Sequence, residues 1–152
     1  MSSDDWVAER LEIRDVIDRY AHHADRRQPK EQAAVFTADG TVLLYEGDPN
    51  ATAPVQTVSG RDDLTSTFAG LIAQYDATTY LNGQSTIERT GPASATGETY
   101  CLAYHVLREN DQRMLLTMSI RYLDSFTKID GSWLIAERKL IFDWTDRRPS
   151  HP

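Results

Sequence analysis

The sequence predicts an α+β fold in which three helices near the amino terminus pack on a mostly antiparallel sheet. Helical periodicity of apolar residues is confined to the first half of the 152-residue chain, and alternating β-branched and aromatic residues dominate from residue 77 onward. Helices and strands do not alternate along the chain, which disfavours a doubly wound parallel sheet. The length is that of one hydrophobic core, so residues 1–152 are expected to form one domain.

The first helix is predicted over residues 4–24. Its apolar side chains recur at spacings of three, four and seven residues, as on an amphipathic helix: Trp6, Ile13, Val16, Ile17, Tyr20 and Ala24. Pro29 ends this pattern, because proline disfavours helical geometry in the residue before it. Shorter helices are predicted over residues 30–37 and 60–75.

Strands are predicted over residues 41–45 and then from residue 77 to the carboxyl-terminal region. A turn at residues 38–40 precedes the first strand, and residues 46–59 are expected to form a loop because they contain one glycine and two prolines. Breaks at residues 91–97, 109–112 and 130–131 divide the second half into a four-stranded meander. Asp130-Gly131 is typical of a tight hairpin turn.

The charge and the motifs that are missing exclude several classes of function. The formal net charge of −7 disfavours binding to nucleic acid or to anionic membranes, because both carry negative charge. The single cysteine, the polar start and the lack of a long apolar run indicate a cytoplasmic protein. No metal-ligand spacing, phosphate-binding glycine loop or dinucleotide motif occurs, so we expect neither a metal nor an organic cofactor.

Side-chain parity places one ionisable residue among apolar neighbours on each of three successive strands. His105 shares a face with Cys101, Ala103 and Leu107, while the even positions over residues 116–126 are apolar except Asp124. The even positions over residues 134–144 are apolar except Arg138. A structural Asp124–Arg138 pair and a functional role are both compatible with this pattern. For His105 we favour a functional role over a core histidine bonded to a backbone carbonyl.

Several segments keep a characteristic order and spacing over nearly the whole chain. They are IDRYAHHAD at residues 17–25, AVFTADGTV at 34–42, GRDD at 60–63 and KIDGSWLIAER at 128–138. Together they resemble the SnoaL-like branch of the nuclear-transport-factor-like cone superfamily, which includes scytalone dehydratase and ketosteroid isomerase. The resemblance implies that helices close a strongly curved sheet into a cone with an apolar pocket. The same cone serves many reactions, so the fold alone does not specify one.

The resemblance also implies where an active site would lie. In dehydratase-like members an aspartate at the end of the first helix works with a pocket histidine on the first strand of the meander. Asp25 matches the aspartate, whereas Tyr80 stands at the position of the histidine. Scytalone dehydratase has a second pocket histidine within a Tyr-His-x-Leu-Arg run, and YHVLR at residues 104–108 reproduces that run with His105.

Three further positions match pocket residues of other members. Tyr20 and Arg138 match residues that bile-acid dehydratases place in the pocket, and Asp124 roughly matches the second pocket acid of ketosteroid isomerase. The catalytic carboxylate of ketosteroid isomerase corresponds to Leu44 here, which disfavours that mechanism. Members commonly associate through the open face of the sheet, so the resemblance implies a homo-oligomer, and we expect a dimer.

These residues predict a cofactor-independent acid–base enzyme, a dehydratase, isomerase or cyclase. Its substrate would be a small, largely apolar oxygenated molecule such as a polyketide or steroid-like compound. A histidine whose pKa is near its unperturbed value of about 6.5 serves as acid or base at neutral pH. We predict Asp25 and His105 as the acid–base pair, with Tyr20, Tyr80 and Tyr122 orienting the substrate oxygen.

Two alternatives remain open at the level of sequence. Epoxide hydrolysis or epoxide-opening cyclisation would use Asp25, Asp124 and Arg138 to position water or a hydroxyl group. A non-catalytic binding domain is the other alternative, and Tyr80 in place of the histidine favours it.

Overall fold

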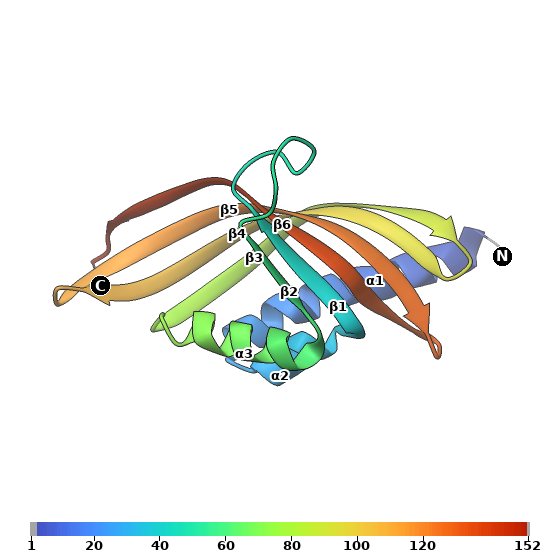
Figure 1. Ribbon diagram of the computed structural model, residues 1–152, viewed down its shortest axis with the longest axis horizontal. Coiled ribbons are helices and arrows are strands. Elements are labelled where there is room, and N and C mark those ends of the chain that lie inside the picture. The colour runs from blue at the N-terminus through green and yellow to red at the C-terminus, as the bar shows by residue number, and fades with distance from the viewer. Residues whose placement is uncertain (1–2, 152) are drawn as a thin grey trace.

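The computed structural model describes residues 3–151, and within them three helices lie under a six-stranded sheet that arches over them (Figure 1). The helices are α1 (Ser3–Asp25), α2 (Pro29–Ala34) and α3 (Arg61–Ile72). The strands are β1 (Phe36–Tyr45), β2 (Gln56–Ser59), β3 (Ala77–Gly91), β4 (Ser94–Glu109), β5 (Gln112–Ile129) and β6 (Ser132–Pro149). The predicted α+β class and the four-stranded meander are confirmed.

The sheet is mixed, with the order β2-β1-β6-β5-β4-β3. Only the β1–β6 pair is parallel among the described strands, and every other neighbouring pair is antiparallel. The sheet is curled but does not close, since β2 and β3 remain its edges. Curvature gives it a concave face, and the helices cover that face (Figure 1).

Helix α1 buries the apolar stripe that the sequence predicted. Ile13, Val16, Ile17 and Tyr20 are each at most 4 % exposed, and burying one such side chain contributes about 1.5–3 kcal/mol. Polar residues on the flank of α1 bind strand β3: the Arg14 guanidinium donates to the backbone oxygen of Gly83 at 2.8 Å. The helix is therefore fixed against the edge of the sheet at which its last residue, Asp25, meets β3.

The region between α2 and α3 differs from the prediction. Helix α2 ends at Ala34, and the chain enters β1 at Phe36, because the backbone here pairs with Ile135 of β6. The amide of Ile135 donates to the Val35 oxygen at 2.9 Å. The expected turn at residues 38–40 is a register shift inside β1. A Cβ on Gly40 would lie 2.7 Å from the Phe36 Cβ, so this close approach requires glycine.

The end of the predicted loop is a strand as well. Residues 56–59 pair with β1 as β2, and only residues 46–55 remain as the loop that projects from the top of the sheet (Figure 1).

The parity predicted for the last strand is wrong at both of its ends. Trp133 and Ile135, at odd positions, are at most 2 % exposed, whereas Trp144 is 53 % exposed. Register shifts between β5 and β6 explain this, since each inserts one extra residue and reverses the faces that follow. The inward assignment of Arg138 holds because this residue lies between the two shifts.

The two hairpins that flank β5 use left-handed turns. Asn110-Asp111 and Asp130-Gly131 all have positive φ, the geometry that suits a two-residue hairpin loop. A further residue with positive φ, Arg27, follows α1 and donates to the backbone oxygens of Ile72 and Tyr75, both at 3.0 Å. Arg27 thereby fixes the carboxyl end of α3 over the concave face.

Candidate active site

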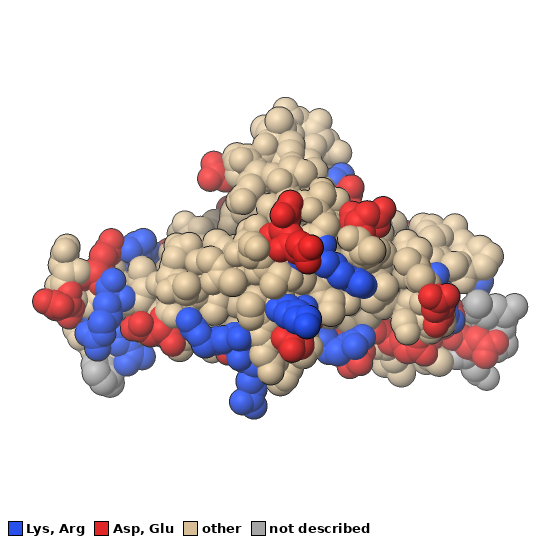
Figure 2. Space-filling view, turned by 60° about the horizontal axis from the view of Figure 1, so that its bottom comes forward, with Lys and Arg blue, Asp and Glu red and all other residues tan. Residues whose placement is uncertain are grey.

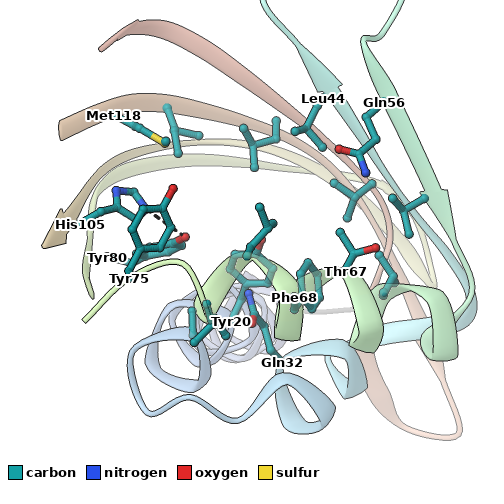
Figure 3. A pocket seen from close by; sticks show the side chains of 18 of the residues that line it. Tyr20, Gln32, Leu44, Gln56, Thr67, Phe68, Tyr75, Tyr80, His105 and Met118 are labelled. Carbon is teal, nitrogen blue, oxygen red and sulfur yellow. Dashed lines mark hydrogen bonds between the residues drawn. The ribbon is translucent and has the colours of Figure 1, made fainter. Parts of the chain in front are cut away.

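A cavity lies between the concave face of the sheet and the three helices. Its walls are mostly aliphatic and aromatic, and its polar lining residues are Tyr20, Gln32, Gln56, Thr67, Tyr75, Tyr80 and His105. Among the described residues, no Asp, Glu, Lys or Arg lines it. Figure 3 shows His105, Tyr80 and Tyr75 together at one end of the cavity, and Gln56 and Thr67 at the other. The His105 imidazole is therefore the titratable base on this surface.

The ring orientation of His105 is fixed by one backbone contact. Its Nδ1 lies 3.2 Å from the Leu116 oxygen on β5, and a carbonyl oxygen only accepts, so Nδ1 carries the hydrogen. In the neutral ring Nε2 is then the free acceptor, and it faces the Tyr80 hydroxyl at 3.4 Å. Burial lowers the pKa of His105, against opposing contributions from the Leu116 hydrogen bond and from Asp25. The imidazole is therefore neutral, with its basic nitrogen toward the cavity end.

Two tyrosines flank this imidazole. The Tyr75 ring lies against it with a centroid distance of 4.4 Å, and the Tyr80 ring meets it edge-on at 5.5 Å. Burial raises the pKa of both phenols, so both hydroxyl groups keep their hydrogen at neutral pH. Because the Tyr80–Nε2 contact is long, the Tyr80 hydroxyl is able to turn toward another acceptor in the cavity.

Asp25 lies next to this group but is not among the cavity-lining residues. Its carboxylate accepts hydrogen bonds from the Thr78 hydroxyl at 2.9 Å and from the Tyr80 amide at 3.1 Å. Burial raises the pKa of Asp25, and the two hydrogen bonds and His105 act in the opposite direction. Among the described contacts, no hydrogen bond joins Asp25 to His105. Asp25 therefore acts on the imidazole through its charge and through the position of Tyr80.

Tyr20 and Gln32 form the helix side of the cavity (Figure 3). The Tyr20 ring makes edge-on contacts with Phe36, Phe68 and Tyr122, with centroid distances of 5.7–6.0 Å. Burial raises the pKa of Tyr20 while the nearby Arg138 charge opposes that rise. A protonated phenol at this place offers a hydrogen-bond donor on the wall opposite the sheet.

Asp124 and Arg138 form a closed ion pair beside the cavity rather than in its lining. The guanidinium donates two hydrogen bonds to the carboxylate, at 2.8 and 2.9 Å, and both side chains are fully buried. The Arg138 Cζ also lies 4.3 Å from the Tyr20 ring centroid and 3.7 Å from that of Tyr122. Burial opposes the charge of Arg138, but Asp124 holds its pKa above the ordinary value.

The predicted site residues therefore fall into two groups. Tyr20, Tyr80 and His105 line the cavity, and Asp25 contacts the backbone of Tyr80. The second group, Tyr122, Asp124 and Arg138, is buried behind the Tyr20 ring.

Sequence reasoning missed Tyr75, Gln32 and the Leu116 carbonyl. Tyr75 falls at the end of the apolar stripe of the helix predicted over residues 60–75, and a glutamine in a short helix gives no signal of its own. Side-chain patterns contain no information about which backbone carbonyl, here that of Leu116, accepts a hydrogen bond.

No group of three or more His, Cys, Asp or Glu side chains in the described chain is arranged to hold a metal ion. No helix within residues 3–151 is long and apolar enough to cross a membrane. On the face shown in Figure 2, acidic and basic side chains are interspersed rather than gathered into one patch.

Comparisons with known proteins agree with this architecture. Residues 6–139 match the model of the SnoaL-like domain. A crystal structure of a protein described as a putative scytalone dehydratase from Novosphingobium aromaticivorans is 26 % identical, with a TM-score of 0.81 over 99 % of this chain and 93 % of that one. A search of curated protein sequences gave no match.

Two more distant structures share the fold. A variant of Rv3472, a protein of unknown function from Mycobacterium tuberculosis, is 23 % identical with a TM-score of 0.77 over 94 % of this chain and 76 % of that one. A type 2 hexachlorocyclohexane dehydrochlorinase is 19 % identical with a TM-score of 0.80 over 99 % and 94 % of the two chains.

Proposed function

The chain belongs to the SnoaL-like domain family, and on that premise we propose that it is a cofactor-independent acid–base enzyme. The observation that carries the proposal is the neutral His105 imidazole, whose Nε2 meets the Tyr80 hydroxyl at the end of an apolar cavity. The reaction would be an elimination of water or a double-bond shift next to a carbonyl group. Both begin with the removal of a proton from carbon.

His105 is the base in this proposal. Its Nε2 would take the proton from the carbon beside the substrate carbonyl, while Nδ1 keeps its hydrogen and donates it to the Leu116 oxygen. A buried histidine with a lowered pKa is in the basic form at neutral pH, which suits this role. The resulting imidazolium would be stabilised by the charge of Asp25.

Tyr80 supplies the second part of the chemistry. As the carbon–hydrogen bond breaks, negative charge develops on the carbonyl oxygen, and the Tyr80 hydroxyl would turn from Nε2 to donate a hydrogen bond to it. The imidazolium then returns its proton. Delivery to another carbon completes an isomerisation, whereas delivery to a hydroxyl on the neighbouring carbon releases water. Tyr80 in place of the family histidine therefore supplies a donor and leaves the base to His105.

The cavity favours a small, largely apolar oxygenated substrate, and a polyketide or steroid-like compound fits this description. Aliphatic and aromatic residues form most of its walls, including Leu64, Phe68, Ile120 and Phe142. No acid lines it in the described chain, so the epoxide alternative has less support, because that reaction would need carboxylates around an ordered water. The homo-oligomer and the cytoplasmic location stay predictions.

The test exploits the first step, which does not require the natural substrate. A thermal-shift screen with hydroxylated polycyclic and polyketide-like ketones would identify compounds that bind. Exchange of their α-hydrogens in D2O, followed by NMR, would then report proton abstraction directly. Wild-type protein is expected to accelerate exchange, and His105→Gln is expected to slow it about 10²–10⁴-fold.

The control is His151→Gln, which removes an exposed histidine and is expected to exchange hydrogen like wild type. Circular dichroism and melting curves would show that both variants are folded. Exchange at the wild-type rate in folded His105→Gln would contradict the proposal. Tight binding of ketones with no exchange in wild type would favour the non-catalytic binding domain.

A further inference from the structure

One of the polar side chains that line the cavity, Gln32, takes no part in the proposed chemistry. Gln32 is 3 % exposed and lines the cavity from α2, yet its side-chain oxygen is buried with no hydrogen-bond partner. Its backbone amide is already bonded to the Gln28 oxygen at 2.9 Å. The Gln32 side chain also interacts with the Tyr20 hydroxyl, so the unmet hydrogen-bonding capacity belongs to the side-chain oxygen.

An unpartnered buried amide oxygen is costly, so its presence on a side chain that lines a cavity is informative. Burying a polar group without a partner destabilises the folded state, and buried polar groups in proteins are nearly always bonded. Neighbouring positions of this wall are apolar, including Ala24, Leu64 and Phe68, and an apolar side chain at position 32 would continue them. A ligand that satisfies the amide would supply the missing partner.

We propose that Gln32, together with the Tyr20 hydroxyl, binds a hydroxyl group of the substrate at a point remote from the reacting carbonyl. The inference rests on the proposed function, since that function places the carbonyl at Tyr80 and His105. A primary amide offers a donor and an acceptor side by side, and a hydroxyl group complements both. A ketone or ether oxygen only accepts, so it would leave the Gln32 oxygen without a partner.

The arrangement of the cavity sets the shape of such a substrate. Figure 3 shows Gln32 and Tyr20 on the helix side and His105 at the end, with apolar side chains such as Phe68 in the same wall. The substrate class is then a largely apolar molecule with a carbonyl at one end and a hydroxyl on the part of the molecule that faces α2. Gln32 would determine specificity for that hydroxyl and would not touch the reacting atoms.

Three simple probes separate these features. 4-(4-Hydroxyphenyl)-2-butanone carries both groups, 4-phenyl-2-butanone lacks the hydroxyl, and 4-(4-methoxyphenyl)-2-butanone replaces it with an acceptor only. Dissociation constants would be measured by calorimetry for wild type, Gln32→Met and the control Gln74→Met, which makes the same change at an exposed position outside the cavity. Methionine has nearly the length of glutamine, and loss of a buried unpartnered oxygen is expected to leave the melting temperature unchanged or higher.

Wild type and Gln74→Met are expected to bind the hydroxyl probe about tenfold more tightly than either other probe, and Gln32→Met is expected to lose this preference. Equal affinities in wild type, binding of none of the probes, or an unchanged preference in Gln32→Met would each overturn the inference. α-Hydrogen exchange on the bound ketones reports the proposed function separately. A Gln32-dependent preference without exchange would overturn the acid–base proposal alone, while exchange without a preference would overturn only the role of Gln32.

Discussion

Two places in this sheet bury ionisable groups among apolar neighbours, and they are built differently. On β5 and β6, the charges of Asp124 and Arg138 pair through two hydrogen bonds and their side chains have no exposed surface, although Nη1 of Arg138 has no hydrogen-bond partner. On β4, His105 is equally buried, yet its imidazole has the backbone hydrogen bond to Leu116 and only a long contact from Nε2 to the Tyr80 hydroxyl. The Asp124–Arg138 pair is bonded internally, whereas His105 faces a cavity and its basic nitrogen has only a weak hydrogen-bond partner.

The difference indicates that the Asp124–Arg138 pair has a structural role, whereas the His105 imidazole is available for chemistry. The charges of Asp124 and Arg138 neutralise each other and cannot change without loss of the pair. The His105 imidazole is neutral, so it is able to gain a proton beside a carboxylate that favours the charged form. Incomplete bonding at a cavity surface, rather than burial alone, distinguishes the candidate catalytic group.

The largest expected effect follows from breaking the closed pair. Arg138→Met leaves the Asp124 carboxylate buried without a counter-charge and is expected to lower the free energy of unfolding by about 3–5 kcal/mol. The double variant Asp124→Leu/Arg138→Met removes both charges and is expected to recover much of that loss. Urea denaturation followed by circular dichroism would measure both. Arg108→Met is the control, because its ion pair with Asp76 is exposed and worth less than about 1 kcal/mol.

A double variant as unstable as Arg138→Met would show that the guanidinium contributes mainly by packing between the Tyr20 and Tyr122 rings. An Arg138→Met variant as stable as wild type would contradict the structural role of the ion pair and would favour a role for Arg138 in substrate binding.

The sequence predicted which side chains meet the core on β4 and β5, because strands alternate faces and no register shift interrupts that pairing. It failed on β6, since an inserted residue leaves no mark in composition and reverses the parity of Trp133 and Trp144. It predicted three polar cavity residues, Tyr20, Tyr80 and His105.

Which side chains bond to one another, in contrast, depends on three-dimensional packing. Parity alone could not distinguish the closed Asp124–Arg138 pair from a binding pair, because the bidentate geometry forms only when both strands are in register. The link from Asp25 to the Tyr80 amide was equally hidden, because it joins a side chain to the backbone over 55 positions of sequence.

A smaller effect is expected from removing the charge near His105. Asp25→Asn keeps an oxygen for the Tyr80 amide but loses the carboxylate that raises the pKa of His105. The imidazolium is then less favoured, so exchange at neutral pH is expected to fall about tenfold. The acid limb of the pH–rate profile is expected to move to lower pH. Asp15→Asn, at an exposed position of α1, is the control. An unmoved acid limb in folded Asp25→Asn would show that Asp25 only anchors β3.

The smallest effect is a pH dependence of stability, which we expect to arise from His105 and not from the Asp124–Arg138 pair. Burial lowers the pKa of His105 in the folded state, so the unfolded chain binds a proton first as pH falls through about 6.5. Stability is therefore fully present above that pH and declines below it, by no more than about 1.4 kcal/mol per pH unit for one proton.

Urea midpoints of wild type and His105→Gln between pH 7.5 and 5, each about 0.5 unit apart, would measure this slope. His105→Gln is expected to show the shallower decline, and Asp124→Leu/Arg138→Met the wild-type slope over this range, because the double variant keeps His105. Parallel curves for wild type and His105→Gln would mean that the folded protein accommodates the imidazolium as easily as water does. The folded protein would then not hold the pKa of His105 below its ordinary value, and the proposed difference from the Asp124–Arg138 pair would be lost.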